Sequence, residues 1–181
     1  TAALAGCSSK EQGSGPVIPV YISSPIASFD PAMSLNDEAA FKVIGMIYEG
    51  LTRINNKGKL ENALMDDWKY TADEDNGTYT LEITLKATQW SDARDVTADD
   101  FVFAWKRIME PEFQCDAAAL LMDLKNAKEV KSGDASIDDL GVCSADTDVL
   151  QVNFSRNIDP EDFLAVCASP ALYPLREDIV G

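Results

Sequence analysis

The chain contains no histidine and has little positive charge. Its 181 residues include 15 lysines and arginines against 31 aspartates and glutamates, so the formal net charge is −16 at pH 7. This charge repels phosphate backbones and anionic lipid surfaces, which argues against nucleic acid and against a basic membrane-binding patch. Histidine is the commonest metal ligand and the usual partner of a nucleophilic cysteine, so its absence argues against a zinc site and against an activated cysteine. We predict no metal site, no cofactor and no catalytic residues.

Long apolar runs are also missing. No stretch approaches the roughly 20 apolar residues that a helix needs to cross a bilayer, so the sequence predicts no membrane-spanning segment. The hydrophobic content of 46% is nevertheless enough to bury one core or two small ones.

Cysteines are few, and their spacing matches no zinc motif. If Cys7 is modified, the three others either form one disulfide and leave one thiol or stay free. We expect Cys143 and Cys167 to be buried and unpaired, because each has apolar neighbours.

The clearest local signal is a capped amphipathic helix. Thr97 and Asp100 have the spacing of a capping pair, and apolar residues follow at helical intervals from Phe101 to Ile108. The helix should end near Met109, because Glu110 precedes a proline.

The remaining pattern predicts an α+β body. Two alternating segments, 68–71 and 78–85, should form a hairpin across a turn at 73–77, whose acidic residues suggest a solvated turn rather than a calcium loop. Antiparallel hairpins with segregated helices are typical of the α+β class. The other expected elements are strands at 17–23, 51–54, 142–145 and 149–154, and helices at about 37–49, at 116–131 with a break near Asn126, and after Asp159.

The start of the chain resembles the end of a bacterial lipoprotein signal peptide. Leu4-Ala5-Gly6-Cys7 has the small-residue pattern at which such peptides are cut, which makes Cys7 the expected lipidation site. The polar run 8–15, rich in glycine and serine, has the composition of a flexible tether. A disordered terminus without lipid is the alternative interpretation.

Two short motifs stand at the start of the capped helix, Trp90-Ser91-Asp92 and Thr97-Ala98-Asp99-Asp100-Phe101. They resemble the central signature of family 5 extracellular solute-binding proteins, the peptide-capturing subunits of bacterial ABC importers, although the family usually has glycine where this chain has Ala93. Ser28-Phe29-Asp30-Pro31, Tyr48-Glu49-Gly50-Leu51 and Leu140-Gly141-Val142 match further motifs in the family's order. Together they cover about residues 16–181.

The resemblance implies the N-terminal part of a type II periplasmic-binding-protein-like fold. Residues 1–15 would be the lipobox remnant and tether, 16–46 the start of the first lobe, 47–167 an inserted α+β subdomain, and 168–181 the return to the first lobe. The second lobe, which completes the peptide site in the family, would be absent.

The function implied is that of a substrate-binding lipoprotein. It would capture oligopeptides outside the cytoplasmic membrane, deliver them to an ABC permease, and work as a monomer held in the cell envelope by its lipid. The family places the loop after its first strand against the ligand backbone. This implies a ligand-binding segment whose backbone and hydroxyl groups could bind an extended peptide, formed by Ser23, Ser24, Pro25, Ile26 and Ala27. An ordinary connecting loop is the alternative.

Other functions fit parts of the pattern. The same family could bind a nickel chelate, a sugar or a signalling peptide. A secreted acidic hydrolase would need two carboxylates about 5 to 9.5 Å apart in a cleft. A surface interaction module would expose an unusually large apolar patch.

Overall fold

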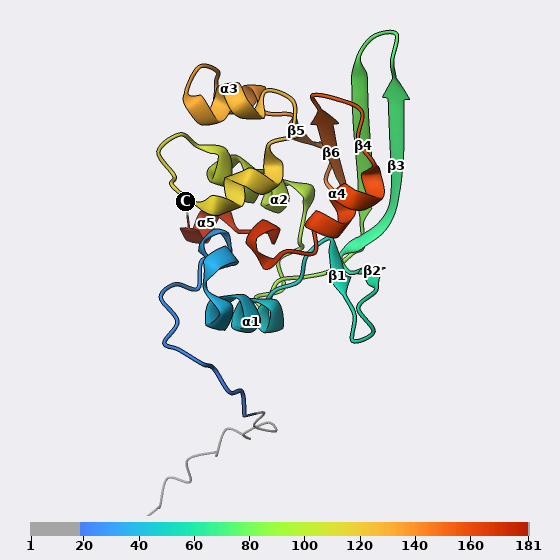
Figure 1. The fold of residues 1–181 in the computed structure, drawn as a ribbon. Coiled ribbons are helices and arrows are strands. Elements are labelled where there is room, and N and C mark those ends of the chain that lie inside the picture. Colours follow the sequence, from blue (N-terminus) through green and yellow to red (C-terminus); the bar gives the residue numbers. More distant parts are fainter. Residues whose placement is uncertain (1–18, 181) are drawn as a thin grey trace, which may run out of the picture.

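The computed structural model describes residues 19–180, so Cys7 and the tether at 8–15 lie outside the described residues. A four-stranded antiparallel sheet forms one layer, and helix α2 (Ala98–Met109) lies against strands β5 and β6 of this sheet (Figure 1). Helix α1 (Glu38–Ile47) lies at the opposite end of the molecule from helix α3 (Ala127–Ser132). Within residues 19–180, no helix is long and apolar enough to cross a membrane.

The sheet has the strand order β3-β4-β6-β5. The predicted hairpin is formed by β3 (Met65–Asp73) and β4 (Thr78–Leu85). Strand β6 (Val149–Phe154) lies between β4 and β5 (Val142–Asp146) and pairs with both. Leu81 lies opposite Val152 and Ile83 opposite Leu150, and all four side chains are buried. The alternation in β4 therefore faces one side of the sheet to the core, as the sequence predicts.

Helix α2 begins and ends where its sequence predicts. The Asp100 carboxylate accepts a hydrogen bond from the backbone N–H of Thr97 at 3.0 Å, which caps the first turn. The buried face includes Phe101, Ala104 and Trp105, and the indole N–H of Trp105 donates to the carbonyl of Leu172 at 3.0 Å. The helix thus connects the sheet to the C-terminal segment.

The other elements are short. A small sheet is formed by β1 (Thr52–Ile54) and β2 (Leu60–Asn62). The predicted break at Asn126 is confirmed, because this residue has φ +61° and separates a 3₁₀ helix from α3. The remaining helices are η1 (Pro31–Asn36), η2 (Asp116–Leu121), η3 (Ile137–Asp139), α4 (Pro160–Val166), η4 (Pro170–Leu172) and α5 (Glu177–Val180).

Two expectations are wrong. The predicted strand at 17–23 is not formed over its described residues, 19–23, which have no regular structure. A strand needs a neighbour to pair its backbone, and local sequence does not supply one. Cys143 is exposed rather than buried, because the alternation of β5 buries Val142 and turns the next side chain outward. Cys167 is buried as predicted, and it is a free thiol, as are Cys115 and Cys143.

Candidate functional site

The predicted ligand-binding residues lie together on an extended segment that leads into η1 and α1 (Figure 1). Ser23, Ser24, Pro25 and Ala27 are exposed, whereas Ile26 is half-buried. Among the described residues, no hydrogen bond joins the backbone of 19–26 to another group. Within the described part of the chain, the backbone groups of 19–26 are therefore unpaired, and contact of 23–27 with a ligand stays a prediction.

The segment is fixed to α1 at its C-terminal end. Ile26 packs against a small apolar cluster of Ala40, Ile44 and Tyr173. The backbone N–H of Ala27 donates to Oδ2 of Asp37 at 3.2 Å, and Oδ1 of the same carboxylate accepts from the N–H of Ala40 at 3.0 Å. These hydrogen bonds, that from Ala40 above all, lower the pKa of the Asp37 carboxyl. Asp37 is thus both the N-cap of α1 and a tie to the segment.

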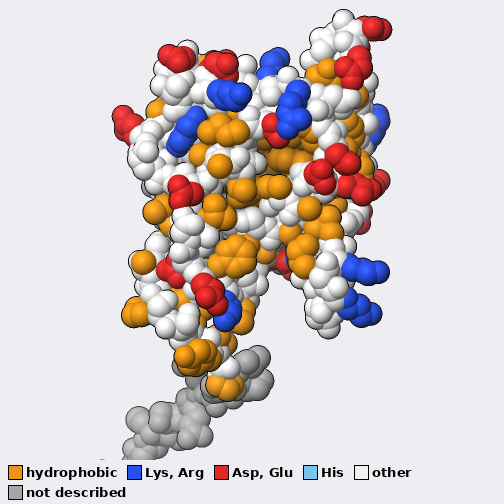
Figure 2. All heavy atoms as spheres, in the orientation of Figure 1, with side chains coloured by type: hydrophobic (Ala, Val, Ile, Leu, Met, Phe, Trp, Pro, Cys, Tyr) orange, Lys and Arg blue, Asp and Glu red, His pale blue; other side chains and the backbone are white. Residues whose placement is uncertain are grey.

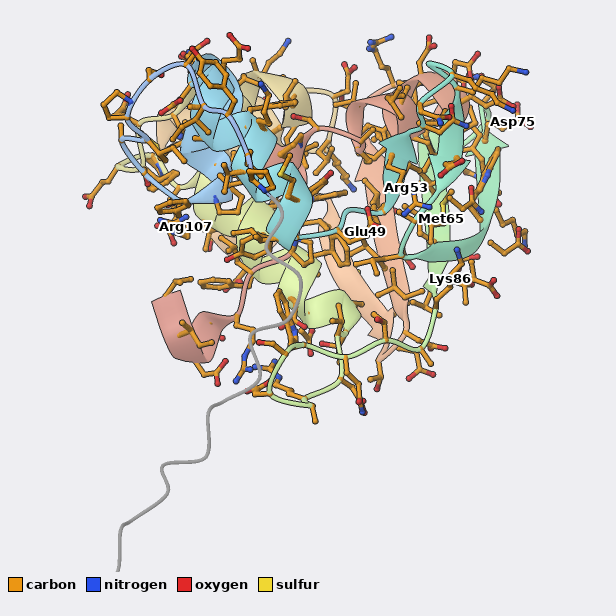
Figure 3. All side chains as sticks on the ribbon, turned by 90° about the horizontal axis from the view of Figure 1, so that it is seen from below. Glu49, Arg53, Met65, Asp75, Lys86 and Arg107 are labelled. Atoms are coloured by element: carbon orange, nitrogen blue, oxygen red, sulfur yellow. The ribbon has the colours of Figure 1, made fainter. Side chains whose placement is uncertain are left out.

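A second attachment joins the segment to α2. Arg107 donates two hydrogen bonds to the Asp30 carboxylate, at 3.1 and 2.6 Å, and its guanidinium carbon lies 4.2 Å from the ring centroid of Phe113. Asp30 also accepts from the N–H of Ala32 and so caps η1. Both charged side chains are only 21% exposed, so this ion pair is less screened than one on the open surface. Figure 3 shows Arg107 far from the β3–β4 side of the molecule, where Met65 and Lys86 lie.

A cavity of about 610 Å³ lies between the end of α1, the turn after β4 and the C-terminal segment. Tyr48 and Trp90 meet edge to face in its wall, with ring centroids 6.2 Å apart. Glu49, at the α1 end, turns toward Arg53 and pairs with it at 2.9 Å (Figure 3). The wall is formed by Met46, Ile47, Tyr48, Glu49, Leu64, Thr88, Gln89, Trp90, Ser91, Asp92, Val96, Pro174, Leu175, Arg176, Ile179 and Val180.

The turn at residues 90–94, called the signature turn below because it begins with the motif Trp90-Ser91-Asp92, forms one edge of this cavity. Asp100 is 2% exposed, and its carboxylate accepts from the indole of Trp90 and from Arg94, each at 3.0 Å. Arg94 also pairs with Asp178 at 2.6 Å, so the turn is tied to α5. Ala93 has φ +69°, the left-handed conformation that glycine adopts without strain.

Ion pairs strengthen the same connection. Arg176 pairs with Asp178 at 2.5 Å and with Asp92. Hydrogen bonds from Arg176 lower the pKa of both carboxyls, that of Asp178 to about 2. The chain of alternating charges therefore holds α5 beside the signature turn at neutral pH.

Gly50, in another family motif, allows two distant segments to meet. A Cβ atom at this position would lie 2.3 Å from the Tyr173 ring and 3.1 Å from the carbonyl of Cys167. Only a residue without a side chain fits there, which gives the glycine of this motif a packing role.

Sequence reasoning missed three of these features. The helix predicted at about 37–49 includes Asp37 in its first turn, but the structure makes Asp37 the N-cap of α1. The Arg107–Asp30 pair spans 77 positions, and no local pattern reveals it. The cavity was missed because its wall combines segments that are distant in the sequence, namely 46–49, Leu64, 88–96 and 174–180. Cys7 lies outside the described residues, so its predicted role has no structural counterpart here.

Comparison of the sequence with known proteins identifies the class of protein to which this chain belongs. Residues 59–179 match the family described as bacterial extracellular solute-binding proteins, family 5 Middle, and the chain belongs to this family. It is 31% identical to the dipeptide-binding protein DppE of Bacillus subtilis and 32% identical to a dipeptide-binding protein of Lactococcus lactis, in each case over 98% of this chain. It covers only 34% and 31% of these two relatives, so it spans about a third of their length.

Solved structures agree with this assignment. Burkholderia pseudomallei OppA matches with a TM-score of 0.76 and 27% identity, over 84% of this chain and 29% of that one. The unliganded open form of the murein tripeptide-binding protein MppA matches with a TM-score of 0.73 and 30% identity, over 85% and 29%. The predicted α+β fold is therefore confirmed as a portion of the fold of periplasmic oligopeptide-binding proteins. The family and these relatives are solute-binding proteins rather than enzymes.

Proposed function

We propose that this chain is part of a substrate-binding lipoprotein that captures oligopeptides outside the cytoplasmic membrane and delivers them to an ABC permease. The observation that carries the proposal is the similarity, along nearly the whole chain, to two dipeptide-binding proteins. The matching structures include a Listeria monocytogenes OppA bound to peptide, at 26% identity and a TM-score of 0.76. Peptide is therefore the ligand class that the comparisons favour.

In the proposed site, residues 23–27 bind the backbone of an extended peptide. Four of its five residues are exposed, and the backbone groups of 23–26 form no hydrogen bond to another described residue, whereas the N–H of Ala27 is bound to Asp37. Ser23 and Ser24 add hydroxyl groups, whereas Pro25 offers only a carbonyl. Contacts of this kind bind the main chain and leave the ligand's side chains unread, which suits a receptor for many sequences.

We also propose the lobe arrangement that the motifs imply, with 16–46 and 168–181 in a first lobe and 47–167 as an inserted subdomain. Support comes from the exposed large hydrophobic side chains. All but Ile54 and Leu60 lie on 19–47 or 177–180, and Figure 2 shows apolar atoms over α1 and the segment below it. These residues are Val20, Tyr21, Ile22, Phe29, Met33, Phe41, Met46, Ile47, Ile179 and Val180. An apolar face of this kind is suited to packing against further parts of the lobe in a protein as long as the relatives.

Membrane attachment through Cys7 completes the proposal. The small-residue pattern before Cys7 and the polar run after it suit a lipid anchor with a flexible tether. The receptor would then diffuse along the outer surface of the membrane close to its permease, as a monomer.

The test is a titration of the ¹⁵N-labelled chain with trialanine, followed by amide chemical shifts. Because half of a site should bind only at millimolar concentration, about 4 kcal/mol of binding free energy, the peptide is added to about 10 mM. We expect saturable shifts at Ser23, Ser24, Ile26 and Ala27. Shifts that glucose produces and trialanine does not would contradict a peptide site, as would peptide shifts confined to other parts of the chain.

A further inference from the structure

We infer that Asp37 and the Asp30–Arg107 pair are positioning residues that fix the direction of the ligand-binding segment before a peptide arrives. The inference rests on the proposed function, because it assumes that residues 23–27 contact the peptide. None of the three side chains needs to touch the ligand. Asp37 acts on the segment from the start of α1, and the pair acts through Asp30, three residues after the segment, and Arg107 on α2.

The first anchor depends on the two oxygens of one carboxylate. Oδ1 of Asp37 caps α1 through the N–H of Ala40, while Oδ2 accepts from the N–H of Ala27. One side chain therefore ties the last residue of the segment to the start of a helix. The apolar contact of Ile26 with Ala40, Ile44 and Tyr173 fixes the neighbouring residue on the same side.

The second anchor has a rigid base. Arg107 belongs to α2, whose buried face packs in the main core through Phe101, Ala104 and Ile108. Its planar guanidinium grips both oxygens of Asp30 and lies over the Phe113 ring, so its orientation is fixed in two ways. Lysine at this position could supply the charge but not the paired hydrogen bonds.

Together the anchors act on residues 26–30 and leave 19–25 projecting with free backbone groups. A strand fixed at one end loses less conformational freedom when a ligand pairs with it, because part of the ordering has already taken place. The anchors therefore raise affinity by pre-organising the segment rather than by adding contacts.

The test uses Asp37→Asn, which separates the two roles of the carboxylate. Asparagine caps helices as well as aspartate does, so its carbonyl oxygen can still accept from the N–H of Ala40. Its NH₂ group is a donor and cannot accept from the N–H of Ala27. We expect amide hydrogen exchange at Ala27 to become about tenfold faster, with an unchanged Tm. Asp159→Asn is the matched control, because Asp159 also caps a helix, accepting from Glu161 at 2.9 Å, and is not in contact with the segment.

The second variant is Arg107→Lys, with Arg156→Lys as its control because Arg156 grips Asp123 through two hydrogen bonds elsewhere on the surface. Arg107→Lys should speed exchange between Ser28 and Ala32, and Arg156→Lys should leave that region unchanged. If exchange in both Asp37→Asn and Arg107→Lys stays within twofold of the wild type, the anchoring role is overturned.

The trialanine titration distinguishes this inference from the proposed function. Weaker peptide-induced shifts in Asp37→Asn and Arg107→Lys, at wild-type Tm, would support positioning. Equal shifts despite faster exchange would overturn it, since the anchors would then hold the segment without helping it to bind. If the wild type shows no shifts at 23–27, the proposed peptide site fails, while the exchange rates still decide whether the anchors order the segment.

Discussion

Ala93 is strained by its own backbone. It adopts φ +69° in the signature turn, where the family usually has glycine, and a left-handed L-residue costs roughly 1–2 kcal/mol. The hydrogen bonds of this turn, from Ala93 N–H to the Trp90 carbonyl and from Trp90 N–H to the Arg94 carbonyl, hold the conformation in place. The turn therefore tolerates alanine at position 93, and its hydrogen bonds offset the strain.

Ala93→Gly should stabilise the chain. Relief of the strain outweighs the larger backbone entropy of glycine in the unfolded state, and we expect a gain of about 0.5–1 kcal/mol in the free energy of unfolding. Urea denaturation measures this as a higher midpoint. Ala72→Gly, in edge strand β3 and without a positive φ, is the control and should lower the midpoint. A lower midpoint for Ala93→Gly would show that the turn carries no strain.

Gly50→Ala should destabilise the chain by about 1–3 kcal/mol, because the added methyl group overlaps the buried Tyr173 ring. Gly45→Ala makes the same chemical change inside α1, where the nearest atom would be Pro170 Cγ at 3.8 Å. It should raise stability by up to about 1 kcal/mol through helix propensity. Thermal unfolding followed by circular dichroism compares the two variants, and equal effects would argue against the proposed overlap.

At the scale of elements, sequence succeeded where the determining contacts are local. Thr97, Asp100 and the apolar spacing after them were enough to fix α2, and alternation fixed the β3–β4 hairpin. Sequence wrongly predicted a strand that includes 19–23, because strand formation depends on pairing with a neighbouring strand, which a local pattern does not identify. The candidate segment was found only through a family resemblance, and its anchors on Asp37 and Arg107 needed the folded structure.

Helix α5 should loosen in acid. The pKa of Asp178 is held at about 2 by Arg176 and Arg94, below its ordinary value of 3.8. A carboxyl with a lowered pKa in the folded state stabilises above its ordinary pKa and loses this contribution as pH falls through the folded value. The pairs to Arg94 and Arg176 should therefore weaken between about pH 4 and pH 2.

Amide chemical shifts of Ile179 and Val180, followed from pH 6 to pH 2, measure this loosening. Asp92 and Asp100 face the same arginines, so Asp178→Asn is needed to isolate the contribution of Asp178. This variant should show the loosened shifts already at pH 6. If Asp178→Asn titrates like the wild type, the behaviour belongs to the other carboxylates.

At the scale of the whole molecule, the apolar face of α1 and α5 should promote self-association of the 181-residue chain. Ile47 is 61% exposed and Phe41 40% exposed, on a body otherwise kept apart by its net charge of −16. We expect concentration-dependent sedimentation at high salt, which Ile47→Gln should reduce. Ile54→Gln replaces a residue of similar exposure, 55%, on β1 and outside this face, and it should have no effect. Equal effects of both variants would indicate non-specific association through exposed apolar residues instead.

Gly50 and Tyr173 are in contact, so the two ends of the chain segment between them, residues 50–173, lie side by side. It contains both sheets and α2, and the buried bond from Thr52 Oγ1 to the Leu164 carbonyl fastens its two ends at 2.6 Å. A unit whose ends meet can be spliced into another host, or removed, without stretching the chain on either side. The close approach of residues 50 and 173 is thus the end geometry that an inserted subdomain, proposed above for 47–167, requires.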